Sequence, residues 1–252
     1  STLQSAASFQ VTQSGTITGN YKTQFCVTFA QTGVAMDFSG TVMVVDGTGY
    51  DRNGASFWWY DQSVHSFEFR KPLVVTANVK RYVWNSTSGL STLRTTNAFQ
   101  ATQSGTITGN YKTQYYITFV QTGVGDDFTG AVVIVDGSNY DRSGASFWWY
   151  DQSTHSFAFQ SPLSVNVGKR YVWNTTSGLS TLQSDTSFQV TQSGSVTGNY
   201  KTQYYITVTS EHDSPTPSAW VYAGDDFIAS VTSPADEDGM GTRYRCTGYK
   251  VD

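Results

Sequence analysis

The chain has 252 residues and a formal net charge of −4, and only 13% of its residues are charged whereas 15% are aromatic. It contains no cluster of Lys or Arg, which excludes the basic footprint of a nucleic-acid-binding protein and a polybasic membrane patch. Its apolar runs are only a few residues long, which excludes a membrane span. Because β-branched and aromatic residues outweigh strong helix formers, the composition predicts an all-β protein.

One phrase occurs three times along the chain. It reads VTQSGTITGNYKTQ at 11–24, ATQSGTITGNYKTQ at 101–114 and VTQSGSVTGNYKTQ at 190–203. Further landmarks, FWWYDQS, RYVW and SGLSTL, recur between the copies at the same spacing. A repeat of this size indicates tandem domains, because the repeats of a solenoid are shorter.

Within the second repeat, alternation and turn residues predict short strands. KTQYYITF places Tyr115, Ile117 and Phe119 on one face, and the β-branched run that follows DFTG enters a turn at Asp136-Gly137. The strand-like segments SFWWYDQS, HSFAFQ, KRYVWNTTSG and SFQVTQSGSVTG come next. Several short strands in one repeat are typical of an immunoglobulin-like β-sandwich, with a small barrel as the alternative.

The repeat boundaries predict four parts: an N-terminal segment 1–20, a domain 21–110, a second domain 111–199 and a shorter third part 200–252. The alternative is a division that starts at Ser1, Ser91 and Ser180, with two complete units and one that stops early. The third part ends without the segment that closes each of the other two domains. A sandwich that lacks its closing strand exposes an apolar groove and an unpaired sheet edge. We therefore expect this incomplete domain to accept a strand from elsewhere.

The N-terminal segment 1–20 is a copy of the missing closing segment. Its apolar residues are Leu3, Phe9, Val11 and Ile17, which correspond to Leu93, Phe99, Ala101 and Ile107 and to Leu182, Phe188, Val190 and Val196. Each contributes about 1.5–3 kcal/mol when buried. Because two whole domains separate the segment from the third part, we expect it to enter the next molecule. Such a head-to-tail contact propagates as a filament of identical subunits unless it closes into a ring.

Several phrases support a resemblance to a known group of proteins. YKTQYYITV, FWWYDQS, SPL and the TRYRCTG ending resemble the Ig-like repeats of secreted and surface proteins from hyperthermophilic archaea. The layout of donor segment, whole domains and incomplete acceptor is similar to that of pilus and thread subunits that polymerise by donor-strand complementation, although such subunits usually have one or two domains. The resemblance implies an extracellular filament at the cell surface. Two alternatives stay open: stalk or spacer repeats of a cell-surface adhesin or S-layer-associated protein, and a carbohydrate-binding repeat array.

The two cysteines lie in the first and the last domain. Cys26 replaces the tyrosines at 116 and 205, and Cys246 replaces the tryptophans at 84 and 173. An even number of cysteines in a secreted protein suggests a disulfide. If the N-terminal segment fills a neighbour's groove, we expect Cys26 to bridge to Cys246 of that neighbour, with two unpaired thiols as the alternative. Two Cys and three His are too few and too scattered for a metal site.

Candidate catalytic residues are scarce. His65 and His155 are repeat equivalents, and no Ser or Asp partner can be singled out for either. We therefore expect neither an enzyme nor a cofactor. The pairs Trp58-Trp59 and Trp148-Trp149 could stack on sugar rings. The interpretation that we favour places one Trp of each pair in the core and the other over a domain junction.

Two sequons fall at equivalent positions, at Asn85 and at Asn174. Both lie on a segment that we expect to face the surface, which predicts glycans on the outside of a filament at these two asparagines. As binding partners of the filament we consider a glycan at a cell surface or another site of attachment to the cell surface. A start at Ser1 would suit a chain from which a signal peptide has been removed.

Overall fold

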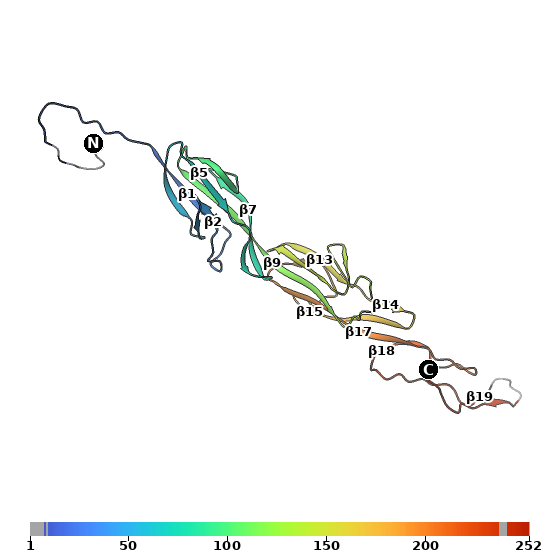
Figure 1. The fold of residues 1–252 in the computed structure, drawn as a ribbon. Coiled ribbons are helices and arrows are strands. Elements are labelled where there is room, and N and C mark those ends of the chain that lie inside the picture. The colour runs from blue at the N-terminus through green and yellow to red at the C-terminus, as the bar shows by residue number, and fades with distance from the viewer. Residues whose placement is uncertain (1–7, 9, 237–240, 252) are drawn as a thin grey trace. The chain divides into compact units, whose positions relative to one another are not determined.

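The computed structural model describes residues 8, 10–236 and 241–251 (Figure 1). All regular structure in these residues is β-structure, which confirms the predicted all-β class. None of the described residues forms a helix that is long and apolar enough to cross a membrane.

The chain divides into two compact units. The first comprises the chain up to Ala35, residues 39–70 and residues 84–110, and the second comprises residues 36–38, 71–83 and the chain from Tyr111 onward. Strand β9 (Gly105–Thr122) supplies residues to both units. The further separation of 200–252 as a domain of its own stays a prediction.

The first unit contains two sheets. In one, β1 (Gln24–Thr32) pairs antiparallel with β4 (Ala55–Tyr60) and parallel with Gly105–Asn110 of β9. The other has the order β3 (Thr48–Tyr50), β2 (Met43–Val45), β5 (Val64–Phe69) and β8 (Thr95–Gln100). The hairpin of β6 (Leu73–Thr76) and β7 (Lys80–Gly89) follows β5 in the chain, but its residues up to Val83 belong to the second unit.

The second unit repeats this arrangement. Here β9 pairs antiparallel with β12 (Ala145–Tyr150) and parallel with the beginning of β17 (Gly194–Ile206). The other sheet has the order β11 (Ser138–Tyr140), β10 (Val133–Val135), β13 (Thr154–Phe159) and β16 (Ser184–Gln189). A hairpin of β14 (Leu163–Asn166) and β15 (Lys169–Gly178) and the strands β18 (Ala219–Tyr222), β19 (Ala235–Asp236) and β20 (Arg243–Tyr244) complete the described strands.

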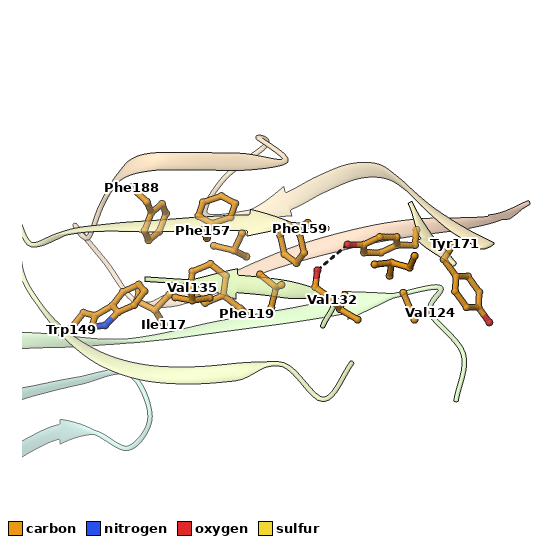
Figure 2. Packing of buried hydrophobic residues seen from close by; sticks show 14 of the residues in the cluster. Ile117, Phe119, Val124, Val132, Val135, Trp149, Phe157, Phe159, Tyr171 and Phe188 are labelled. Carbon is orange, nitrogen blue, oxygen red and sulfur yellow. Dashed lines mark hydrogen bonds between the residues drawn. The ribbon is translucent and has the colours of Figure 1, made fainter. Parts of the chain in front are cut away.

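The core of the second unit follows the alternation in the sequence (Figure 2). Ile117 and Phe119 are fully buried, and Tyr115 packs partly buried against the same cluster. The ring of Phe119 meets those of Trp149 and Phe157 at centroid distances of 5.8 Å and 5.4 Å. These tilted and edge-on contacts suit the quadrupoles of aromatic rings, so the face predicted from the sequence is the core face.

The predicted turn at Asp136-Gly137 is also present. Both residues have positive φ, 47° and 78°, and they connect β10 to β11 in a tight hairpin. An Asp-Gly pair tolerates this left-handed backbone, which is why it marks such turns. Asp46-Gly47 does the same between β2 and β3.

Ile107 and Ile17 occupy equivalent positions and offer a matched test of the core. Ile107 is fully buried, whereas Ile17 is 67% exposed. We expect Ile107→Ala to lower the free energy of unfolding by about 2–5 kcal/mol, because it leaves a cavity. Ile17→Ala should change it by less than about 0.5 kcal/mol in the unassembled chain. Urea unfolding of the two variants measures the difference, and equal losses would contradict this packing.

Candidate functional site

Each complete sandwich is closed by a segment from the following repeat. In the first unit, Gly105–Asn110 runs parallel to Val27–Thr32 in unbroken register. Ile107 and Ala101 of this closing segment are fully buried. Phe99 packs against Phe67 with the ring centroids 6.0 Å apart. The segment therefore joins both sheets, through β8 in one and β9 in the other.

The second unit is closed in the same way. Gly194–Asn199 runs parallel to Ile117–Thr122. Phe188, Val190 and Val196 of its closing segment are buried. The expectation that a leucine also closes each domain is wrong. Leu93 and Leu182 are 53% and 52% exposed, because they precede the strands that enter the two sheets.

The N-terminal copy of the closing segment behaves differently. Residues 10–23 form no strand. Val11 and Ile17 are 75% and 67% exposed, and Tyr21 is 95% exposed although its equivalents Tyr111 and Tyr200 are buried. Leu3 and Phe9 lie outside the described residues. The same sequence is thus buried twice in the chain and exposed once.

The first strand of the third repeat is shorter and less buried than its equivalents in the complete domains. Strand β17 ends at Ile206, whereas β9 continues to Thr122, whose equivalent by repeat spacing is Glu211. Ile206 and Val208 are partly exposed, although the equivalent Ile117 and Phe119 are fully buried. The apolar face of this strand is therefore only partly covered within the described residues.

The other sheet of the third repeat is also incomplete. Residues 226–231 occupy the place of β13 but form no strand, and Ile228 is 84% exposed. In the complete domains this strand pairs with β8 or β16 of the closing segment. Among the described residues, both sheets of the third repeat thus lack the neighbour that the closing segment provides elsewhere.

The remaining residues predicted from the sequence are accessible to different degrees. Cys26 is partly buried and Cys246 is exposed, and both are free thiols. Asn85 and Asn174 of the two sequons are exposed. Trp59 and Trp149 are buried in the core, and Trp58 is 68% exposed.

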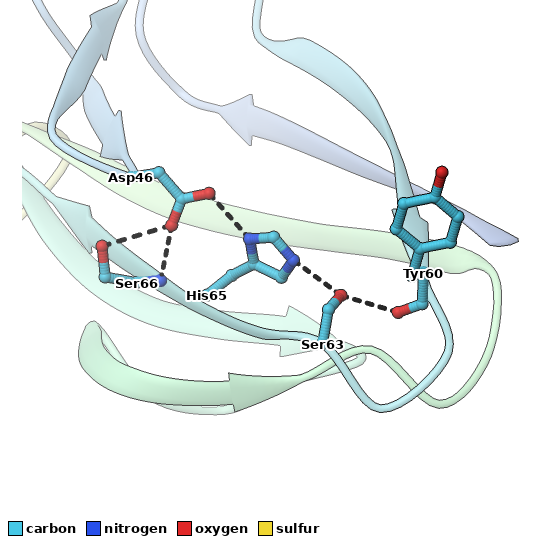
Figure 3. A network of polar contacts seen from close by, with 5 residues as sticks. All are labelled: Asp46, Tyr60, Ser63, His65 and Ser66. Atoms are coloured by element: carbon cyan, nitrogen blue, oxygen red, sulfur yellow. Dashed lines mark hydrogen bonds and ion pairs between the residues drawn. The ribbon is translucent and has the colours of Figure 1, made fainter.

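A polar network that the sequence did not reveal lies in each complete domain. Figure 3 shows the network of the first domain. Nε2 of His65 lies 2.8 Å from the Ser63 hydroxyl, and Nδ1 lies 2.7 Å from the carboxylate of Asp46. The same carboxylate accepts a hydrogen bond from the backbone N–H of Ser66 at 2.8 Å. The Asp-Gly turn and the Ser-x-His spacing at the start of β5 were the available signal, but only the hairpin brings them together.

This Ser-His-Asp arrangement does not have the geometry of a nucleophilic triad. A nucleophilic serine directs its hydroxyl hydrogen at the imidazole. The Ser63 hydroxyl instead donates to the carbonyl of Tyr60 at 2.6 Å. The imidazole of His65 stacks on Trp59 with the ring centroids 3.6 Å apart. The network is therefore suited to fixing the β2–β3 hairpin against β5 and the core.

The same environment determines the charge of the aspartate. Burial raises the pKa of Asp46, but hydrogen bonds from Ser66 and His65 outweigh it and leave the pKa below its usual value. The pKa of Asp136 in the second unit is lowered in the same way, by hydrogen bonds from Ser156 and His155. Both carboxylates are thus used within the domain. No group of His, Cys, Asp and Glu side chains among the described residues could hold a metal ion.

Comparisons with known proteins show no family for this chain. No family model matches it, and no curated protein matches it. Among solved structures, the major pilin protein T-13 of Streptococcus pyogenes serotype GAS131465 is similar, at 9% identity and a TM-score of 0.19, over 73% of this chain and 97% of that chain. A similarity this low carries no argument about this chain.

The lowered pKa of Asp46 predicts a pH dependence of stability. Its contribution is present above the unfolded pKa of about 3.9 and is lost as the pH falls through the lower folded value. We expect melting temperatures to fall between about pH 4 and pH 2. Asp46→Asn should lower stability at pH 7 and flatten this fall for the first unit, because it removes the titrating group. Thermal melts followed by circular dichroism measure it, and an unchanged profile would contradict the assignment.

Proposed function

We propose that this protein is a structural subunit of an extracellular filament and polymerises head-to-tail by donor-strand complementation. The observation that carries the proposal is that one repeated segment is buried at Ile107 and Val196 but exposed at Ile17. The third repeat has the complementary deficit, in both of its sheets. A second copy of the chain carries the segment that would fill it.

The repeat supplies a register for this joint. In the second unit, Gly194 pairs with Ile117 and Val196 with Phe119. The same spacing pairs Gly15 of one copy with Ile206 of the next, and Ile17 with Val208. Ile17 would then cover the partly exposed apolar face of the acceptor. Apolar burial and ladder hydrogen bonds favour such a joint, as in other cases of strand addition.

In this proposal the protein has a structural role and no catalytic activity. The two Ser-His-Asp networks are repeated in equivalent domains, and each serine hydroxyl is bonded to a backbone carbonyl. Both sequon asparagines are exposed, as a glycan acceptor must be, which supports the predicted surface glycans. These features suit a filament that is exposed outside the cell.

The register bears on the predicted disulfide. In the second unit, Trp173 pairs with Tyr200, and the N–H of Tyr205 donates to the carbonyl of Gly168. By equivalence, Cys246 of the acceptor copy would face Tyr21 of the donor copy. Cys26 of the donor copy would lie five strand positions beyond Tyr21. That is about 17 Å, whereas the Cα atoms of a disulfide lie within about 7 Å. The intersubunit bridge between Cys26 and Cys246 does not fit this register.

The joint is tested by removing the donor. We expect deletion of residues 1–20, or the single change Ile17→Asp, to abolish fibres in electron micrographs and leave folded monomers. Thr16→Asp is the matched control, because its equivalent Thr106 is exposed in the complete domain. Fibres from the deletion would refute donor-strand assembly. A full chain that stays monomeric at every concentration would instead favour the stalk alternative.

The register itself is tested on non-reducing gels. We expect assembled material to run as monomer with or without reductant, because the cysteines are too far apart to pair. Cys26→Ser should assemble normally. A ladder that collapses with reductant would contradict the register and restore the disulfide predicted from the sequence.

A further inference from the structure

A three-residue cluster links the hairpin of the first repeat to the strands of the second. Nε of Arg81 on β7 donates to the side-chain oxygen of Gln114 on β9 at 2.8 Å. Its guanidinium lies over the ring of Trp148, 4.2 Å from the centroid. Trp148 in turn packs against Tyr116 with the centroids 5.1 Å apart. The arginine thus combines a hydrogen bond with a cation–π contact.

The same cluster recurs one repeat later. Nε of Arg170 donates to Gln203 at 2.8 Å, and its guanidinium lies 4.1 Å from the centroid of Trp220. Trp220 packs against Tyr205 at 5.3 Å. Gln203, like Gln114, is only 8% exposed. We call this arrangement of Arg, Gln and Trp the junction clamp.

The strand register identifies a third set of clamp residues. Tyr116 pairs with Trp148 and Tyr205 with Trp220, and in the first unit Cys26 pairs with Trp58. Gln24 pairs with Tyr60, as Gln114 does with Tyr150. The first unit therefore carries the Gln and Trp of a clamp, at Gln24 and Trp58.

The arginine of this third set is at the other end of the chain. Tyr244 pairs with Ala235 in the β19–β20 hairpin, as Tyr171 pairs with Leu163 in the β14–β15 hairpin. Arg243 therefore corresponds to Arg170. It is exposed, and no contact of its side chain is found within the described part of the chain.

In the first unit, the Gln and Trp of the clamp have no arginine beside them among the described residues. Gln24 is exposed, and Trp58 is 68% exposed. The N–H groups of Tyr116 and Tyr205 donate to carbonyls of the preceding hairpin, at Val79 and Gly168. The equivalent N–H of Cys26 instead donates to the Ser104 hydroxyl at 3.1 Å. No described residue takes the place of the hairpin that supplies the carbonyl and the arginine in the other two clamps.

We propose that Arg243 of the acceptor subunit forms a junction clamp with Gln24 and Trp58 of the donor subunit. This inference rests on the donor-strand assembly proposed above, since the inserted segment 1–20 leads directly into Gln24. The clamp would cover Trp58, the aromatic side chain otherwise available to a sugar. It would also couple the acceptor's last hairpin to strands β1 and β4 of the donor's first domain.

Arg243→Ala, Trp58→Ala and Gln24→Ala test the clamp in the full chain. We measure the critical concentration for assembly by sedimentation and monomer stability by thermal melting. A cation–π contact of the usual strength predicts that Arg243→Ala and Trp58→Ala each raise the critical concentration about threefold to thirtyfold. Gln24→Ala should raise it less, and Arg243→Lys should recover only part of the loss because an ammonium lacks the planar fork. Melting of the monomers should not change, because these side chains are exposed before assembly.

Two controls make the result specific. Arg245→Ala removes a nearby positive charge and should assemble like the parent chain. The double variant Arg243→Ala/Trp58→Ala should be no worse than the weaker-assembling single variant, because the two residues meet in one contact. Additive losses, or normal assembly of the single variants, would overturn the clamp. If the single variants assemble normally while deletion of residues 1–20 abolishes fibres, donor-strand assembly stands without it.

Discussion

The structure depends on one pairing, the parallel contact between the first strand of each sandwich and the closing segment that follows it by more than 70 residues. Val27 meets Gly105 in this way in the first unit, and Ile117 meets Gly194 in the second. The pairing buries Ile107 and Val196 over the aromatic core. Since the closing segment also adds a strand to the opposite sheet, its absence leaves both sheets incomplete at once.

This constraint explains the organisation of the chain. Strand β9 closes one sandwich with its first residues and opens the next with its last, and β17 does the same one repeat later. Neither complete sandwich is self-sufficient, because each relies on the segment that follows it. In the described part of the third repeat no such segment covers the strands, and Val11 and Ile17 are exposed. In the assembly that we propose, donor and acceptor are two consequences of one repeat.

The other unusual features serve the same sandwich. The ring of His65 stacks on the buried Trp59. The carboxylate of Asp46 accepts a hydrogen bond from the backbone N–H of Ser66 on the same strand as His65. Asp127 is bonded by Lys169 and Tyr171, which ties the β14–β15 hairpin to the loop after β9. Burial raises the pKa of the Tyr200 phenol, whose hydroxyl donates to the carbonyl of Gln160. Polar residues that resemble catalytic groups are thus largely used to hold loops and hairpins.

The sequence by itself determined the all-β class, the repeat, the core face of Ile117 and Phe119, and the turn at Asp136-Gly137, because these follow from local alternation and backbone preference. Only the tertiary structure decided that Leu93 stays exposed, that His65 reaches Asp46, and that Arg81 covers Trp148. Such contacts join residues that are far apart in the chain. They depend on which strands become neighbours, whereas alternation along one strand tells only which side chains face the core.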